Sequence, residues 1–272
     1  MTSRIWLCLV TMWAQGLRRG QREKAHSRCH DSCISCRTAF GVCTDDGFYR
    51  AGEDRDGTGH TSGKGADVKA LDKYGMTPLL WAAAYNQNPA VITILMKAGS
   101  NIKAQDKDGV TALMQAAKYN QNPEMITTLL KAGADIKAQD KNGETPLMYA
   151  AWVNQNPEVI TTLLKAGADI KAQDKNGETA LMLAAGDNQN PAVIITLVKA
   201  GSNIKAQDKD GVTALMQAAE YNQNSEVITT LLKLGADAKA KSKEGKTALD
   251  YAQANEKLKG TDALKKIEKA AK

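Results

Sequence analysis

The feature that most constrains the fold is a stretch of sequence that occurs twice without change. The nineteen letters TTLLKAGADIKAQDKNGET run from Thr127 to Thr145 and again from Thr161 to Thr179. The spacing of the two copies, from Thr127 to Thr161, is a period of thirty-four. A fixed period of roughly 20–50 residues is typical of chains that stack copies of one supersecondary unit. The repeat therefore favours a solenoid over a single globular core.

The same period continues through most of the chain. One glycine stands at the same position in every period, and a threonine stands two residues after each of these glycines. Residues 65–71 match the tail of a unit whose front half is missing. The glycines are Gly75, Gly109, Gly143, Gly177, Gly211 and Gly245. The full units, called units 1 to 5, cover 72–105, 106–139, 140–173, 174–207 and 208–241, and a C-terminal unit covers 242–272 as a cap.

Unit 3 shows what each repeat encodes locally. The letters DKNG form a turn in which Gly143 is free to take a positive φ. Thr145 then caps a first helix, and Asn156 with Pro157 starts a second helix that ends at Gly167. The spacing of apolar residues gives each helix one apolar face. These residues are Leu147, Ala150 and Ala151 in the first helix, and Val159, Ile160, Leu163 and Leu164 in the second.

Each predicted helix has only two or three turns, which is too short to be stable alone in water. Stacked units bury the apolar faces against one another, so every copy needs the same neighbour contacts. We infer that this need explains the repeated letters.

The unit resembles the ankyrin repeat over residues 64–272. The matching pattern is Asp-x-x-Gly-x-Thr-Pro/Ala-Leu, then Ala-Ala, then Val-Ile-x-x-Leu-Leu-x-x-Gly-Ala-Asp. The resemblance implies an all-α solenoid of stacked helix–turn–helix units with β-hairpin loops. It also implies a concave face, formed by loop tips and first helices, that binds another protein. The segment Asn-Gln-Asn-Pro is one residue longer than the family's usual turn, which explains a period of thirty-four in place of thirty-three.

One residue of the family pattern is missing. The histidine that usually follows Thr-Pro-Leu is absent from every unit, which puts its hydrogen bonds in question. Its place is taken by Leu80, Met114, Met148, Met182, Met216 and Asp250.

The copies differ at a few positions while the apolar faces stay constant. Counted from the first Asp of each unit, positions 3, 5, 10, 13 and 14 vary, and in units 1 to 5 every aromatic residue falls at one of them. Tyrosine and tryptophan supply much of the energy in many protein interfaces. The alternative to a binding role for these residues is packing between neighbouring units, above all at position 10. The predicted partner-binding residues are Tyr74, Met76, Trp81, Tyr85, Lys118, Tyr119, Glu144, Tyr149, Trp152, Asp187, Glu220 and Tyr221, of which Trp81, Tyr85, Tyr119, Tyr149 and Trp152 are expected to form one aromatic patch.

Other recurring polar residues favour structural roles. The Asn-Gln-Asn triplets are interpreted as capping and turn residues rather than as a binding ladder. The turn aspartates, such as Asp140, are interpreted as hydrogen-bond acceptors of their turns, because stacked copies about 10 Å apart are too distant for paired acid–base work. From residue 64 onward the chain has no His or Cys. The repeats therefore offer no His or Cys to serve as a metal ligand, nucleophile or imidazole base.

Residues 1–63 have a different composition. They hold all eight arginines, all five cysteines and all three histidines of the chain. We expect this segment to be disordered, and a translation from an unsuitable start or a shifted frame would explain its composition. Residues 1–16 resemble a short secretory signal, with an incidental apolar run as the alternative. The cluster of His26, Cys29, His30, Cys33, Cys36 and Cys43 leaves a metal or redox role open.

These patterns together predict a non-catalytic protein-binding scaffold that needs no cofactor. We expect its partner to be another protein and the chain to be a monomer without a membrane span. The net charge of +6 is too small to suggest nucleic-acid binding by charge alone. The alternative is a metal- or redox-active protein that uses the N-terminal Cys/His cluster and keeps the repeats for targeting. The compartment does not follow from the sequence.

Overall fold

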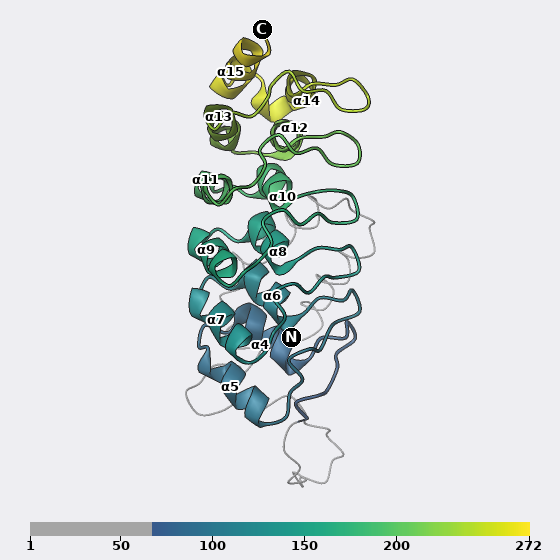
Figure 1. Ribbon diagram of the computed structural model, residues 1–272, viewed down its shortest axis with the longest axis vertical. Coiled ribbons are helices and arrows are strands. Elements are labelled where there is room, and N and C mark those ends of the chain that lie inside the picture. The colour runs from purple at the N-terminus through teal and green to yellow at the C-terminus, as the bar shows by residue number, and fades with distance from the viewer. Residues whose placement is uncertain (1–66) are drawn as a thin grey trace, which may run out of the picture. The chain divides into compact units, whose positions relative to one another are not determined.

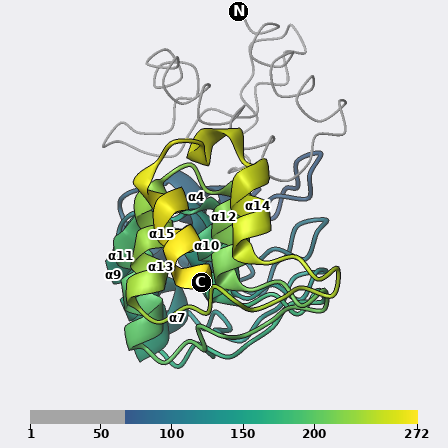
Figure 2. The same ribbon diagram turned by 90° about the horizontal axis from the view of Figure 1, so that it is seen from above.

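The computed structural model describes residues 67–272, and the predictions for residues 1–63 lie outside this part of the chain. From Val68 to Lys272 the chain forms one compact unit. Its helices stand in two columns, with the first helix of every repeat in one column and the second helix in the other (Figure 1). Long loops project from the side of the first column, as the view from above also shows (Figure 2).

Within these residues the chain contains twelve α-helices and no named strand. The loops carry only isolated antiparallel bridges, such as the one between Gln173 and Thr179. The predicted all-α solenoid is therefore confirmed. The first helices are α4 (Pro78–Tyr85), α6 (Ala112–Tyr119), α8 (Pro146–Val153), α10 (Ala180–Asp187), α12 (Ala214–Tyr221) and α14 (Ala248–Ala254). The second helices are α5 (Ala90–Lys97), α7 (Pro123–Lys131), α9 (Pro157–Lys165), α11 (Pro191–Lys199), α13 (Ser225–Lys233) and α15 (Asp262–Ala271), with a short 3₁₀ turn η1 (Glu256–Leu258) before α15.

Helix ends in unit 3 lie where the local sequence predicts them. The side-chain oxygen of Thr145 accepts a hydrogen bond from the Met148 N–H at 3.4 Å, and Asn156 caps α9 by accepting from the Glu158 N–H at 2.9 Å. At the other end of α9, Gly167 has φ of +93°. The Ala168 N–H donates back to the Leu163 carbonyl at 3.0 Å, which closes the helix with the hydrogen bond expected of a C-terminal glycine.

Methionine sulfur takes over the hydrogen bond that the missing histidine left in question. The backbone N–H of Thr145 donates to the Sδ of Met148 at 3.4 Å, and Thr111 and Thr213 make the same contact with Met114 and Met216. Thioether sulfur is a weak acceptor. In the C-terminal unit Asp250 supplies a carboxylate instead, at 2.7 Å from the Thr247 nitrogen. In these four units the threonine N–H thus has a side-chain acceptor at the start of the first helix.

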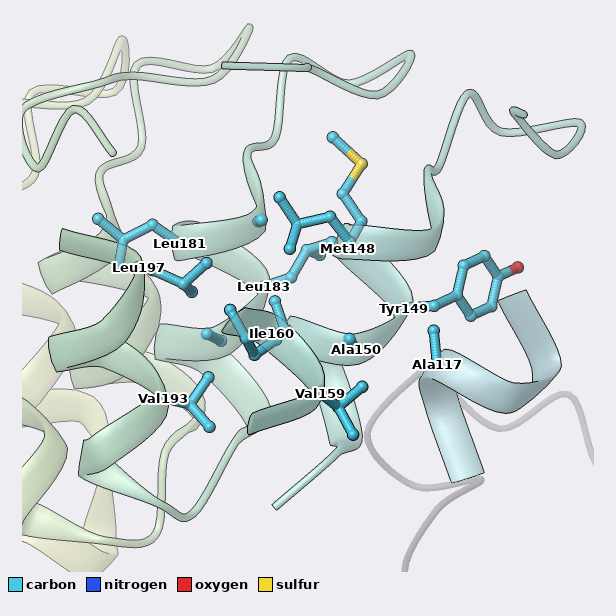
Figure 3. Close-up of a cluster of buried hydrophobic side chains, with 14 of the residues drawn as sticks. Ala117, Met148, Tyr149, Ala150, Val159, Ile160, Leu181, Leu183, Val193 and Leu197 are labelled. Atoms are coloured by element: carbon cyan, nitrogen blue, oxygen red, sulfur yellow. The ribbon is translucent and has the colours of Figure 1, made fainter. Parts of the chain in front are cut away.

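The core runs continuously between the units. Val159 and Ile160 of α9 and Val193 and Leu197 of α11 belong to one buried cluster that extends over both units (Figure 3). These side chains and Leu163 are fully buried. The small side chains of Ala150 and Ala151, also buried, belong to the same core. The predicted apolar faces are confirmed, except that Leu164 is only partly buried.

Hydrogen bonds between units supplement this core. In units 2 to 5 the first asparagine of the Asn-Gln-Asn triplet reaches back to the unit before it. Asn154, which is fully buried, donates to the carbonyls of Ala117 and Asn120 at 2.9 and 2.8 Å. Its own oxygen accepts from the Asn156 N–H at 2.9 Å. The predicted turn role is therefore confirmed, and a bond between units is added to it. Asn120, Asn188 and Asn222 repeat the pattern.

The loops are joined by a second set of bonds. The Lys175 N–H donates to the Asn142 carbonyl at 2.9 Å, one unit away. This approach depends on Gly143, whose φ is +82° and at which an added Cβ would lie 3.2 Å from the Lys175 nitrogen. Asp140 closes the same turn by accepting from the Asn142 and Glu144 N–H groups, both at 2.8 Å. The predicted turn role of these aspartates is confirmed.

Candidate protein-binding face

Three aromatic rings stack along the first helices of units 1 and 2. Trp81 and Tyr85 lie one turn apart on α4, with ring centroids 5.7 Å apart. Tyr119 holds the position of Tyr85 in the next unit, and these two rings stack at 5.4 Å. Trp81 is 43% exposed and Tyr85 is 48% exposed. The repeat thus brings rings that lie one full period apart in the sequence into contact.

A second aromatic pair continues this arrangement in unit 3. Tyr149 and Trp152 meet edge to face at 6.5 Å. The ammonium group of Lys118 lies 5.0 Å from the ring of Tyr119, 5.8 Å from that of Tyr149 and 4.1 Å from that of Trp152. Cations are attracted to aromatic faces at such distances. Lys118 therefore bridges the two groups of rings. We call Trp81, Tyr85, Tyr119, Tyr149 and Trp152 the aromatic row.

Carboxylates hold three of these rings in place. The Trp81 indole N–H donates to Asp72 at 3.1 Å, and the Tyr149 hydroxyl donates to Asp140 at 2.9 Å. In both units the ring at position 10 is held by the turn aspartate at position 1. The Trp152 indole donates to Asp187 of the next unit at 2.9 Å. Rings fixed in this way lose little conformational entropy when a partner binds.

Tyr85 differs electrostatically from an isolated tyrosine. Burial raises the pKa of its phenol, and the neighbouring Tyr119 raises that pKa further. Like any tyrosine hydroxyl, it is protonated at neutral pH and can donate a hydrogen bond. A partly exposed ring with such a donor suits a protein interface.

The twelve predicted binding residues differ in how accessible they are. Four are exposed, namely Tyr74, Trp81, Tyr85 and Tyr221, at 38%, 43%, 48% and 56%. Five are partly buried, namely Lys118, Tyr119, Trp152, Asp187 and Glu220. The remaining three are buried, namely Met76, Glu144 and Tyr149, at 8%, 3% and 8%. Tyr74 and Tyr221 lie in the first and fifth units, outside the aromatic row.

The three buried residues correct the expectation that they lie on the open surface. Position 5 contacts position 10 of the following unit: the Gln115 amide donates to the Met76 sulfur at 3.5 Å, and the Gln217 amide donates to Glu178 at 3.3 Å. Tyr149 is held at position 10 by its bond to Asp140, as the packing alternative anticipated. These positions support the face from beneath. The role of Asp72 and Asp140 in fixing the rings was not predicted from the sequence, although the constant spacing of nine residues between Asp72 and Trp81, and between Asp140 and Tyr149, was a usable signal.

In the described part of the chain, residues 67–272, no group of three or more His, Cys, Asp or Glu side chains could hold a metal ion. None of its helices combines the length and the apolar character needed to cross a membrane. The Cys/His cluster of residues 26–43 and the signal-like residues 1–16 lie outside the described residues.

The comparison with protein families gives one match. The model for ankyrin repeats, which spans three copies, matches residues 60–140, 79–174, 113–208, 147–242 and 181–271. The overlapping matches extend from before unit 1 to the C-terminal helix. No curated protein matches the chain.

Proposed function

The chain belongs to the ankyrin-repeat family, whose repeats are generally protein–protein interaction modules, and we propose that it is a non-catalytic scaffold that grips a partner protein with its aromatic row. Proteins of this family are typically non-catalytic. The partner is another protein rather than a nucleic acid, and the scaffold acts as a monomer.

One observation carries this proposal. Five rings on three consecutive first helices form a connected row, and its first two members are each more than two-fifths exposed. Large aromatic side chains that are exposed together on a folded surface favour a binding site. Tryptophan and tyrosine also dominate interface hot spots, because they bury a large area and keep a polar group. Tyr74, Tyr221 and Glu220 extend the proposed contact surface along the stack.

Affinity capture from cell extract tests the proposal. Wild-type chain is compared with Trp81→Ala/Tyr85→Ala, which removes the exposed part of the aromatic row. The matched control is Ile94→Ala on α5, since Ile94 is an apolar residue with 63% exposure in the other column of helices. We expect the wild type and the control to retain the same partner and the double variant to lose it. Equal retention by all three would show that binding does not use this face.

A further inference from the structure

The turn that opens the C-terminal unit differs from the turns of units 1 to 5. In those five units position 1 is an aspartate, whose Oδ1 accepts the backbone N–H groups of positions 3 and 5 at 2.8–2.9 Å. In the C-terminal unit position 1 is Ser242, which is 6% exposed. Within residues 67–272 the hydroxyl oxygen of Ser242 is buried and has no hydrogen-bond partner. The N–H groups of Glu244 and Lys246, at positions 3 and 5, therefore lack the side-chain acceptor that their equivalents have.

A pocket of about 290 Å³ lies beside this turn, between unit 5 and the C-terminal unit. Helices α12 and α14 of these two units are neighbours in the first column (Figure 1). The lining of this C-terminal pocket includes Asp210 and Glu220 from unit 5, and Ser242, Glu244, Lys246 and Tyr251 from the C-terminal unit. Glu220 also belongs to the contact surface proposed above. The pocket is large enough to receive one side chain of a bound protein.

Unit 3 shows which group fills the equivalent place. The Oδ2 of Asp140 accepts the hydroxyl of Tyr149 at 2.9 Å, while its Oδ1 accepts the two N–H groups of the turn. Tyr251 stands nine residues after Ser242, as Tyr149 stands nine residues after Asp140. Serine is shorter than aspartate and carries no charge. The C-terminal unit thus keeps the donors that hold a carboxylate in unit 3, but position 1 supplies no carboxylate.

The loops around the two places are built alike. At the start of unit 3 the Lys141 N–H donates to the Asp108 carbonyl at 2.9 Å, and at the start of the C-terminal unit the Lys243 N–H donates to the Asp210 carbonyl at 2.8 Å. Position 3 of the preceding unit is therefore an aspartate in both places. Because unit 3 combines this aspartate with a carboxylate at position 1, the two are compatible.

The charges of the C-terminal pocket are mixed. Position 5 is Glu144 in unit 3 but Lys246 in the C-terminal unit, so a cation replaces an anion next to the turn. The Lys246 ammonium lies 2.8 Å from the Glu244 carboxylate. Glu220 opposes a bound anion, whereas unit 2 has Lys118 at the same position. Removing the charge of Glu220 should therefore strengthen the binding of an anion.

We propose that the C-terminal pocket receives the carboxylate of an aspartate or glutamate side chain of the partner protein, in the place that the Asp140 carboxylate holds in unit 3. This inference rests on the proposed function and specifies the chemistry of the partner. The two backbone N–H groups and the hydroxyls of Ser242 and Tyr251 supply the donors, and hydrogen bonds to a charged acceptor are stronger than those between neutral groups. The bound carboxylate also gives a partner to the buried hydroxyl of Ser242, which is costly to leave without one.

Other ligands fit these groups less well. A lysine or arginine side chain of the partner is attracted to Asp210 and Glu220, but it has no acceptor for the N–H groups or the hydroxyls. A neutral amide has an acceptor and lacks the charge. Across residues 67–272 no set of three or more His, Cys, Asp or Glu side chains could hold a metal ion.

Fluorescence anisotropy on the full chain tests the inference with labelled synthetic peptides. The probe is a glycine/serine peptide with two glutamates, and its matched control has two glutamines, which have nearly the same shape without the charge. We expect the glutamate peptide to bind at least about tenfold more tightly than the glutamine peptide. Equal binding of these two peptides, or tighter binding of a peptide with two lysines, would overturn the inference.

Substitutions at Ser242 test the location. Ser242→Asp supplies the carboxylate from within the chain, so binding of the glutamate peptide should fall to the level of the glutamine peptide. The melting temperature should also rise, because aspartate can close the turn as in units 1 to 5. Ser242→Ala is the control, since it leaves the place open and should stay within about threefold of the wild-type affinity. Wild-type affinity in Ser242→Asp, or a melting temperature below that of Ser242→Ala, would show that no carboxylate binds here.

Two further variants test the groups around the pocket. Tyr251→Phe removes one donor and should weaken binding of the glutamate peptide by about tenfold. Glu220→Gln removes a repelling charge and should strengthen that binding by about threefold. Unchanged affinity in Tyr251→Phe, or weaker binding in Glu220→Gln, would contradict a carboxylate in this place.

The outcome separates this inference from the proposed function. If a partner is captured through Trp81 and Tyr85 but glutamate and glutamine peptides bind equally, the scaffold role stands and the carboxylate site is wrong. If the glutamate peptide binds in a manner that depends on Ser242 while capture ignores Trp81 and Tyr85, the reverse holds.

Discussion

At the scale of single residues, the buried asparagines carry more structure than their polar character suggests. Asn154 makes two hydrogen bonds to unit 2 and one within its own turn. Asn154→Ala leaves two buried carbonyls and one N–H without a partner, and should lower the free energy of unfolding by about 2–3 kcal/mol. Gln155, the exposed neighbour, is the control, and Gln155→Ala should stay within about 0.5 kcal/mol of wild type. Urea denaturation measures both, and equal effects would contradict this role for Asn154.

Two glycines are expected to respond in opposite directions to the same change. Gly186 lies inside helix α10, and a Cβ there would meet only Gln217, at 3.7 Å or more. Gly186→Ala should therefore stabilise the protein by up to about 1 kcal/mol through higher helix propensity. Gly143→Ala should destabilise it, because φ is positive and the Lys175 backbone lies 3.2 Å from the added atom. Thermal denaturation would show the contrast, and a lower melting temperature for Gly186→Ala would refute the packing described for α10.

At the scale of elements, the start of helix α14 depends on pH. The Thr247 backbone N–H and hydroxyl lower the pKa of the Asp250 carboxyl. A carboxylate with a lowered folded pKa stabilises the folded state above its unfolded pKa, and this contribution is lost as the pH falls through the folded pKa. Because the group is exposed and screened, Asp250→Asn should cost less than about 1 kcal/mol at neutral pH. The difference from wild type should vanish in acid, as denaturation at both pH values can measure; a difference that persists in acid would exclude this cap as its source.

The helices and their caps could be predicted from the sequence because their determinants are local. Thr145, Asn156, Pro157 and Gly167 act within a few residues of themselves. The burial of Glu144 could not be predicted in the same way, since it depends on how the units pack against one another rather than on residues close to it in the sequence. The stacking of Tyr85 on Tyr119 was predictable, because residues one period apart lie side by side in a stack. The position of Lys118 between the two groups of rings was not predictable in this way.

At the scale of the whole molecule, the stack is held by contacts between neighbouring units. Each repeat bonds to the next through the core, the asparagines and the loop backbone. Deleting unit 3, residues 140–173, joins unit 2 to unit 4, and these units carry the same kind of apolar faces. The shorter chain should therefore still fold, but with lower stability. Circular dichroism should show a helical spectrum with a lower melting temperature. A random-coil spectrum would contradict a modular stack.

If the partner binds the aromatic row, Trp152→Ala should weaken binding without unfolding the protein. Trp152 is partly buried against the core, whereas Leu163 is fully buried, so Leu163→Ala serves as the stability reference and should cost about 2–5 kcal/mol. The decisive measurement is the affinity of the captured partner for the Trp152→Ala protein, taken together with its melting temperature. We predict a loss of about thirtyfold or more in affinity, about 2 kcal/mol, with a melting temperature closer to wild type than that of Leu163→Ala. Unchanged affinity, or unfolding as severe as that of Leu163→Ala, would contradict binding at the aromatic row.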